Sequence, residues 1–355
     1  MWPDNVLTER LNLRYPIFQA PMGSITTPSL AAAVSDAGGM GGLGMWGFNA
    51  DDARRRIEGF RQLSSGSLNV NYPLWPDAGD LGDAAPGMRK RVQDLYDANG
   101  LGAVPVPQGS AGEVCAEHLE TLTRSKPEVV SFHFGLPDAE IVSALRAVGV
   151  FVICSATTVA EARALEAGGV DAVIAQGTEA GGHRGTFTGV DISMQPGLFA
   201  LLPQVVAAVS VPVIAAGSIS NGRGIAAALA LGASGVQVGT AFLQAEEANV
   251  SAGHRAGLET ATDASTVVTD VISGRPSRFV RNRLIDALEG EAPVPFPAQM
   301  ALTGPLGAGH DPQLSAVFAG QGVPQIRSMN AAELIETLAQ ETTARLGELA
   351  AWTRN

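Results

Sequence analysis

Residues 170–185 read VDAVIAQGTEAGGHRG, an apolar run followed at once by a glycine-rich segment. The run at 170–174 is typical of a buried parallel strand. Four glycines then fall within nine residues, and glycine lets the backbone take a positive φ and approach a ligand closely. One imidazole, His183, sits among them. A strand end, a glycine-rich loop and a side chain that titrates near neutral pH indicate a functional site. The alternative is a flexible loop with an incidental surface histidine.

The same pattern of an apolar run, a polar or glycine turn and a helix recurs along the chain. We expect eight strands, at residues 17–20, 40–44, 68–71, 129–134, 150–154, 172–175, 213–216 and 236–239. Helical periodicity is found at residues 28–37, 50–63, 139–148, 159–167, 198–209 and 222–231. Eight such units predict an α/β fold, the TIM (β/α)8 barrel, with its active site at the C-terminal ends of the strands. A doubly wound open sheet is the alternative, but Pro21-Met22-Gly23-Ser24 after the first strand does not match a dinucleotide fingerprint.

Two stretches depart from this rhythm. Residues 73–127 form a long insertion with a helical pattern near 87–98, a candidate cover for the barrel mouth. After Phe242 the rhythm ends, and the proline-rich residues 293–297 cannot form a regular helix. We therefore predict a barrel of residues 1–244, completed by a C-terminal helix within 325–355. Residues 245–324 would form a smaller, mainly helical domain that covers the substrate.

Composition limits the partners and the location. The 355 residues carry a net charge of -12, which argues against nucleic acid. Cys115 and Cys154 lack the spacing of a metal site, so we predict no metal and reduced thiols in the cytoplasm. Residues 1–10 are charged where a secretion signal would be apolar. Residues 224–243 are uncharged but divide into a helix and a strand, so we predict no membrane segment.

Polar and glycine residues at other strand ends suggest what the site binds. In barrels, the turns after the last two strands often hold a phosphate through main-chain N–H groups, and Gly217, Ser218, Gly239 and Thr240 suit that task. Ordinary tight turns are the alternative. The amides of Asn69, Asn71 and Gln176 can both donate and accept hydrogen bonds, as a flavin edge requires. His133, at the end of the fourth strand, is either a core histidine or a second site residue.

Several of these pieces together resemble the nitronate monooxygenase family of FMN-dependent barrels, formerly called 2-nitropropane dioxygenases. The most specific piece is Glu-Ala-Gly-Gly-His-Arg-Gly at 179–185. Residues 131–137 and 301–306 are similar to the bacterial class I branch. The other matching pieces lie at residues 16–23, 37–39, 212–224, 237–242 and 318–322.

The resemblance implies an FMN across the barrel mouth and an oxidoreductase that converts nitronates, such as propionate 3-nitronate, with O₂ to a carbonyl compound and nitrite. His183 would be the catalytic residue, acting on a neutral nitroalkane or an anionic nitronate, and His133 a second polar group in the substrate pocket. The residues implied to bind FMN are Met22, Asn69, Gln176, Gly181, Gly182, Gly217, Ser218, Gln237, Val238, Gly239 and Thr240. The oligomeric state, monomer or homodimer, stays open.

Two other functions are compatible with the sequence. A related FMN barrel that takes hydride from NAD(P)H, a quinone reductase or a FabK-type enoyl-thioester reductase, shares the loop at 179–185; residues 319–322 and the region of His133 favour the monooxygenase. A non-catalytic ligand-binding barrel is the third possibility. The chain also departs from family members that carry tyrosines and a lysine within residues 293–305: it has Phe296 and Gln299 there, which predicts a more apolar pocket.

Overall fold

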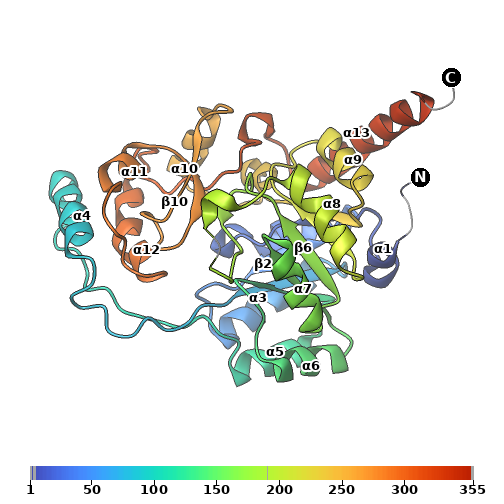
Figure 1. The fold of residues 1–355 in the computed structure, drawn as a ribbon, viewed down its shortest axis with the longest axis horizontal. Helices are drawn as coiled ribbons and strands as arrows, with labels where there is room; N and C mark the ends of the chain where they lie inside the picture. The colour runs from blue at the N-terminus through green and yellow to red at the C-terminus, as the bar shows by residue number, and fades with distance from the viewer. Residues whose placement is uncertain (1, 3–4, 190, 353–355) are drawn as a thin grey trace.

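Eight parallel strands form the central sheet of the protein (Figure 1). The computed structural model describes residue 2, residues 5–189 and residues 191–352. The sheet runs in the order β1-β9-β8-β6-β5-β4-β3-β2. Its strands are β1 (Ile17–Gln19), β2 (Gly41–Gly44), β3 (Leu68–Pro73), β4 (Val129–His133), β5 (Phe151–Ala156), β6 (Ala172–Gln176), β8 (Val213–Ala216) and β9 (Gly235–Val238).

The first strand closes the sheet onto the second. Gln19 N donates to Met40 O and Met40 N donates to Ile17 O, both at 2.9 Å, beside a parallel bridge between Phe18 and Met40. The predicted TIM barrel is therefore confirmed. Both ends of each of the eight predicted strands lie within two residues of the ends of the observed strand. Its interior is filled by apolar side chains from alternate strand positions, among them Phe18, Val129 and Ile214.

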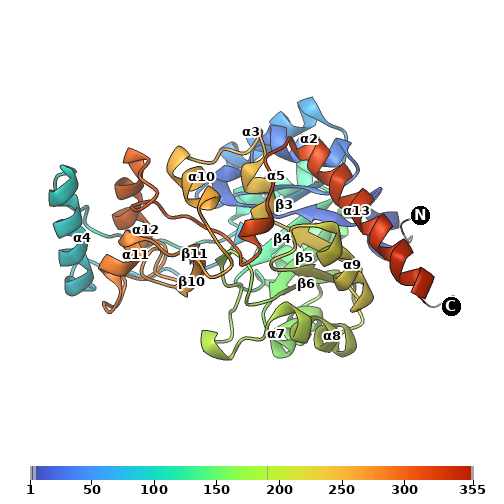
Figure 2. The same ribbon diagram turned by 90° about the horizontal axis from the view of Figure 1, so that it is seen from above.

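Helices surround the barrel in the places where period-3.6 patterns predict them. They are α2 (Pro28–Asp36), α3 (Ala50–Leu63), α6 (Ala139–Ala147), α7 (Val159–Ala167), α8 (Leu198–Ala208) and α9 (Gly222–Ala230), with a short α1 (Val6–Leu11) before the first strand. The sequence pattern did not predict α5 (Ala116–Ser125). Cys115, at its N-cap, makes no side-chain capping bond, so the usual start signal is absent. The last helix, α13 (Ala331–Trp352), packs on α9 and α2 (Figure 2).

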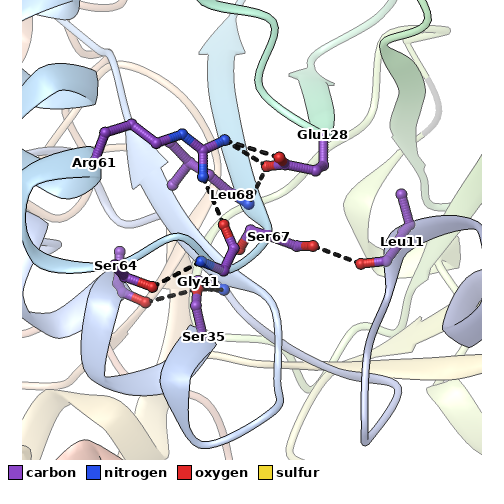
Figure 3. A network of polar contacts seen from close by, with 10 residues as sticks. Leu11, Ser35, Gly41, Arg61, Ser64, Ser67, Leu68 and Glu128 are labelled. Carbon is purple, nitrogen blue, oxygen red and sulfur yellow. Dashed lines mark hydrogen bonds and ion pairs between the residues drawn. The ribbon is translucent and has the colours of Figure 1, made fainter.

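Polar contacts at the N-terminal ends of the strands hold the barrel together on the face away from the site (Figure 3). Glu128, directly before β4, accepts from Arg61 Nη2 at 2.7 Å and from Leu68 N, at the start of β3, also at 2.7 Å. Gly41 N, at the start of β2, donates to Ser35 Oγ at 3.1 Å. Ser35 Oγ also donates to Ser67 O, directly before β3, at 2.8 Å, so these bonds connect the starts of three neighbouring strands. Because barrel chemistry takes place at the opposite ends of the strands, we assign this network to stability.

A smaller lobe lies beside the barrel (Figures 1 and 2). It contains α10 (Ala252–Glu259), α11 (Arg283–Leu288), α12 (Ala298–Thr303) and an antiparallel hairpin of β10 (Thr266–Thr269) and β11 (Ser277–Val280). From the insertion, α4 (Pro86–Asn99) joins its apolar cluster through Met88, Val92 and Tyr96. Tyr96 Oη donates to Leu302 O at 2.7 Å. We propose that α4 folds as part of this lobe, with the lobe's own chain at residues 245–324.

No helix among the described residues is both long and apolar enough to span a lipid bilayer.

Candidate active site

A cavity of about 360 Å³ opens at the C-terminal ends of the barrel strands. A volume of this size suits a small-molecule ligand. Most of the residues predicted to form the site line this one cavity. They are Met22, His133, Gln176, Gly181, Gly182, His183, Gly217, Ser218, Gln237, Gly239 and Thr240.

Two predicted residues, Asn69 and Val238, are not among the lining residues. Asn71, two positions after Asn69 on β3, lines the cavity instead. Side chains two apart on a strand share a face but lie about 7 Å apart along it, so Asn69 belongs one layer deeper in the barrel. It is fully buried, and its amide oxygen and nitrogen have no hydrogen-bond partner. Val238 alternates with Gln237 and packs in the cluster outside the barrel wall.

The loop after β6 is held rigidly. Its residues Gly182–His183 form β7, which pairs antiparallel with β11 of the lobe, in the register His183 with Ser277. The Arg184 side chain is completely buried: Nη1 donates to Gly177 O at 2.7 Å and Nη2 to Gln176 O at 3.0 Å. These bonds satisfy the buried guanidinium and pull the end of the loop back onto β6. The flexible-loop alternative therefore does not hold.

A buried carboxylate fixes the next segment. Glu161, on α7, is completely buried, and its Oε1 accepts from Thr186 Oγ1 at 2.7 Å and from Phe187 N at 2.9 Å. Its Oε2 accepts from Thr157 N at 2.6 Å. Burial raises the pKa of this carboxyl, but the hydrogen bonds from Thr186 and Thr157 outweigh burial and leave the pKa below its ordinary value. The sequence shows Thr158 and Glu161 at capping-box spacing, which explains the helix start but not this contact.

His183 stands in the cavity among aromatic rings. Its ring centroid lies 5.1 Å from that of Phe296, 5.6 Å from Phe318 and 5.8 Å from Phe134. Its Nε2 atom is buried and has no hydrogen-bond partner. Burial, followed by the positive charge of neighbouring groups, lowers the pKa of His183 to about 3. The imidazole is therefore neutral at physiological pH, and one nitrogen is left for a ligand.

His133 lines the same cavity but both of its nitrogens have partners. Nδ1 lies 3.0 Å from Ser155 Oγ, and Nε2 lies 3.2 Å from His183 O. Because a carbonyl only accepts, Nε2 carries the hydrogen and Nδ1 accepts from Ser155. Burial lowers the pKa of His133 to about 4, against a smaller opposing effect of the bond to the His183 carbonyl. His133 therefore combines the two interpretations, core histidine and site residue. Both ring nitrogens contact protein groups, and the side chain also borders the cavity.

The turns after β8 and β9 face the same cavity from neighbouring strands. Ser218 adopts a left-handed backbone with φ 51°, and Gly217 has φ 128°. The hydroxyl of Ser218 is already engaged: it donates to Glu179 O at 3.0 Å and accepts from Gly322 N at 2.9 Å. Thr240 Oγ1 likewise accepts from Gly320 N at 3.0 Å. Residues 319–322 thus hold the two turns together through hydrogen bonds to their hydroxyl groups. The turns can offer main-chain N–H groups to an anion.

Glycine is required at two positions around the cavity where backbone segments come close together. A Cβ on Gly181 would lie 2.4 Å from Gly320 N, and one on Gly44 would lie 2.4 Å from Gly23 N. Gln237 Oε1, on the cavity floor, is buried without a partner. An unpartnered acceptor in the cavity fits a ligand that carries a hydrogen-bond donor on its edge, such as a flavin ring.

Several site residues were missed by the sequence analysis. Trp46 and Phe318 line the cavity, and Arg275 lies behind it, with its guanidinium carbon 3.8 Å from the Phe134 ring centroid. Arg275 also donates to Thr186 O. Arg275 lies in a turn of the lobe, and the residues around it form no motif that predicts a site residue. Phe296 lines the cavity as the departure at residues 293–305 suggested. Gln299 does not: it is buried and bonds Val294 N and Val271 O within the lobe.

A closed parallel barrel with a histidine and glycine turns at its C-terminal mouth defines the class of barrel enzymes. Comparison with known proteins gives the family. Residues 4–341 match the nitronate monooxygenase family model, so the chain belongs to the nitronate monooxygenase family, a family of flavoprotein oxidoreductases.

Individual relatives agree with this assignment. A probable nitronate monooxygenase of Staphylococcus aureus strain Newman is 39% identical over 307 residues, which cover 85% of this chain and 86% of the relative. The structure of nitroalkane oxidase from Streptomyces ansochromogenes superposes with a TM-score of 0.91 at 37% identity, covering 97% of this chain and all of that one. FabK from Thermotoga maritima is also similar, with a TM-score of 0.75 at 28% identity and 99% of both chains covered.

Proposed function

We propose that this protein is an FMN-dependent monooxygenase that oxidises alkyl nitronates with O₂ to a carbonyl compound and nitrite. The observation that carries the proposal is the unpartnered Nε2 of His183, in the cavity that both glycine turns also line. The family supports the flavin chemistry, and the nitroalkane oxidase supports a nitro compound as substrate.

The residues of the mouth fit FMN in particular. Main-chain groups at Gly217, Gly239 and Thr240 would hold the phosphate, because the described lining residues include no lysine or arginine to supply a positive charge. Gln176 donates to His183 O at 3.1 Å and accepts from Gly185 N at 2.8 Å, which leaves one amide N–H and one oxygen lone pair for the flavin. Gln237 Oε1 and His183 Nε2 would face the ring system. When bound, FMN supplies the electron chemistry, and the chain orients the substrate.

The low pKa of His183 bears on the state in which the substrate arrives. A group with a pKa near 3 is a poor base at neutral pH, because general bases work best when their pKa is near the operating pH. A neutral imidazole can still donate a hydrogen bond to an anion. We therefore favour the anionic nitronate over the neutral nitroalkane as substrate, with His183 as hydrogen-bond donor to its nitro oxygens.

The NAD(P)H-dependent reductase is the second candidate, and the similarity to FabK favours it. One experiment separates the two. The purified protein is first examined for flavin absorbance, then mixed anaerobically with NADPH or NADH, and separately with ethyl nitronate in air. We expect a yellow protein, slow bleaching by either nucleotide and rapid release of nitrite. Rapid bleaching by a nucleotide without nitrite release would assign the reductase, and a colourless protein that takes up no added FMN would reject both.

A further inference from the structure

A second cavity of about 570 Å³ adjoins the first. It lies between β3, the insertion and α12 of the lobe. Trp46, Pro73 and Met300 line both cavities, so the two compartments share a wall. Beside the second cavity, the first and last segments of the insertion pair through an antiparallel bridge between Trp75 and Gly112.

One aromatic ring of the first cavity lies close to rings that line the second. Phe296 lies with its ring centroid 5.1 Å from His183 in the first cavity and 5.1 Å from Trp75 in the second. Trp46 stacks on the same ring at 6.0 Å. A ligand group that extends from His183 along Phe296 would therefore point toward the second cavity, which meets the first at Trp46, Pro73 and Met300.

The lining of this cavity has a definite chemistry. Most of the surface is aromatic or aliphatic, with Phe48, Tyr72 and Trp75 among its rings. The described lining residues of both cavities include no lysine and no arginine, whereas Glu113 contributes a carboxylate. A second negative charge on the ligand would meet no cation here and would be disfavoured.

Tyr72 adds one polar group. The residue is buried, borders the second cavity, and its hydroxyl has no hydrogen-bond partner. Burial raises the pKa of the phenol above its ordinary value, so the hydroxyl stays protonated and able to donate. Buried hydroxyls without partners are rare, which indicates a ligand acceptor at this position.

We propose that the second cavity binds the tail of the substrate and selects apolar or aromatic tails, with an uncharged hydrogen-bond acceptor contacting Tyr72. The inference rests on the proposed function for the reacting nitronate group. It places propionate 3-nitronate, whose tail is a carboxylate, among the poor substrates. The preferred class is nitronates of arylalkyl or longer alkyl nitro compounds.

The first test fills the cavity from α12. Ala301 lines only the second cavity, and Ala301→Trp would occupy it. We expect the ratio of kcat/KM for the nitronate of 4-phenyl-1-nitrobutane to that for ethyl nitronate to fall about tenfold, the usual scale for losing burial of one aromatic group. The matched control is Ala308→Trp, at an exposed position outside both cavities, which should leave the ratio unchanged. An equal ratio in both variants would overturn the proposal.

The second test concerns the charge of the substrate tail and the hydroxyl of Tyr72. In the wild type, propionate 3-nitronate should have a kcat/KM at least tenfold below that of the phenylbutyl nitronate; the reverse order contradicts the proposal. Tyr72→Phe should lower kcat/KM about fivefold for a nitronate whose tail carries a ketone and leave the phenyl tail unaffected. An equal effect on both tails would remove Tyr72 from the site.

A binding measurement separates failure of this inference from failure of the proposed function. The probe is 4-phenyl-2-butanone, which has no nitro group, titrated into the purified protein by calorimetry. If no nitronate is oxidised but the probe binds and Ala301→Trp raises its Kd at least tenfold, the tail site stands without the reaction. If ethyl nitronate is oxidised but the Kd of the probe is the same in Ala301→Trp and Ala308→Trp, the reaction stands without the tail site.

Discussion

His133 and His183 border the same cavity, yet their surroundings differ in one respect. His133 has protein partners on both nitrogens, whereas Nε2 of His183 has none. Both are neutral, because burial lowers the pKa from 6.5 to about 4 for His133 and to about 3 for His183. Charge therefore does not distinguish them. We propose from this comparison that the free nitrogen, rather than the residue type or its burial, marks the group that would contact the substrate.

The largest expected effect is on activity when His183 is replaced. His183→Phe fits the surrounding aromatic rings but removes the hydrogen bond to the nitronate, so kcat/KM for ethyl nitronate should fall roughly 10²–10³-fold. The measurement is initial rate of nitrite release at equal flavin content. His310→Phe, at an exposed histidine outside the cavity, is the control and should retain full activity. Activity within threefold of wild type in His183→Phe would show that this residue does not touch the reacting group.

The same substitution at His133 should have a different signature. His133→Phe leaves Ser155 Oγ without its partner and removes one of the two side-chain hydrogen bonds to His183 O, so the free energy of unfolding should fall by about 1–3 kcal/mol. Activity should fall only about tenfold, through displacement of β7. In His183→Phe the free energy of unfolding should change by less than about 1 kcal/mol, since no polar partner is orphaned. Urea unfolding of both variants provides the measurement. Equal destabilisation would break the comparison.

The third prediction concerns stability in acid. Each histidine has a folded pKa, about 4 for His133 and about 3 for His183, below its ordinary value of 6.5. The unfolded chain therefore binds protons first as pH falls, and the free energy of unfolding decreases below about pH 6.5 by up to about 1.4 kcal/mol per pH unit for each histidine. Either Phe variant should show a shallower decrease between about pH 6 and pH 4. A slope equal to that of the wild type would mean that the replaced histidine is not held neutral.

The same pKa values predict the pH dependence of activity. kcat/KM for a nitronate that is already anionic should show no inflection from either histidine between roughly pH 5.5 and pH 8. A step near pH 6.5 that disappears in His183→Phe would show instead that His183 titrates in the working range and acts as a base.

The smallest effect is expected at Ser155, which supports only His133. Ser155→Ala removes the donor to Nδ1 of His133 and should cost about 1 kcal/mol of stability and about two- to threefold in kcat/KM. Ser193→Ala, at an exposed hydroxyl outside the cavity, is a suitable control. A loss as large as that of His183→Phe would mean that the tautomer of His133 is itself part of the chemistry.

The sequence predicted the parts of the site that sit on single strands. Gln176 and His133 end strands whose apolar runs are local, and His183 follows seven residues after the end of β6. It did not show that Asn71 lines the cavity while Asn69 lies deeper, because a strand's alternation shows which residues share a face but not how deep each one lies. It missed Arg275 and the contact of Glu161 with residues 186–188, because these depend on segments that are distant in the chain.

The sequence alone determined the barrel, since each β/α unit is specified by its own apolar period and its own turn. It also located the glycine loop and the turns after β8 and β9, which need particular residue types. Only the tertiary structure decided that β7 pairs with a strand 94 residues away, that residues 319–322 occupy the hydroxyls of the two turns, and that Phe296 separates two cavities. These contacts join elements whose encounter is fixed by the packing of the lobe on the barrel, and no local pattern records that packing.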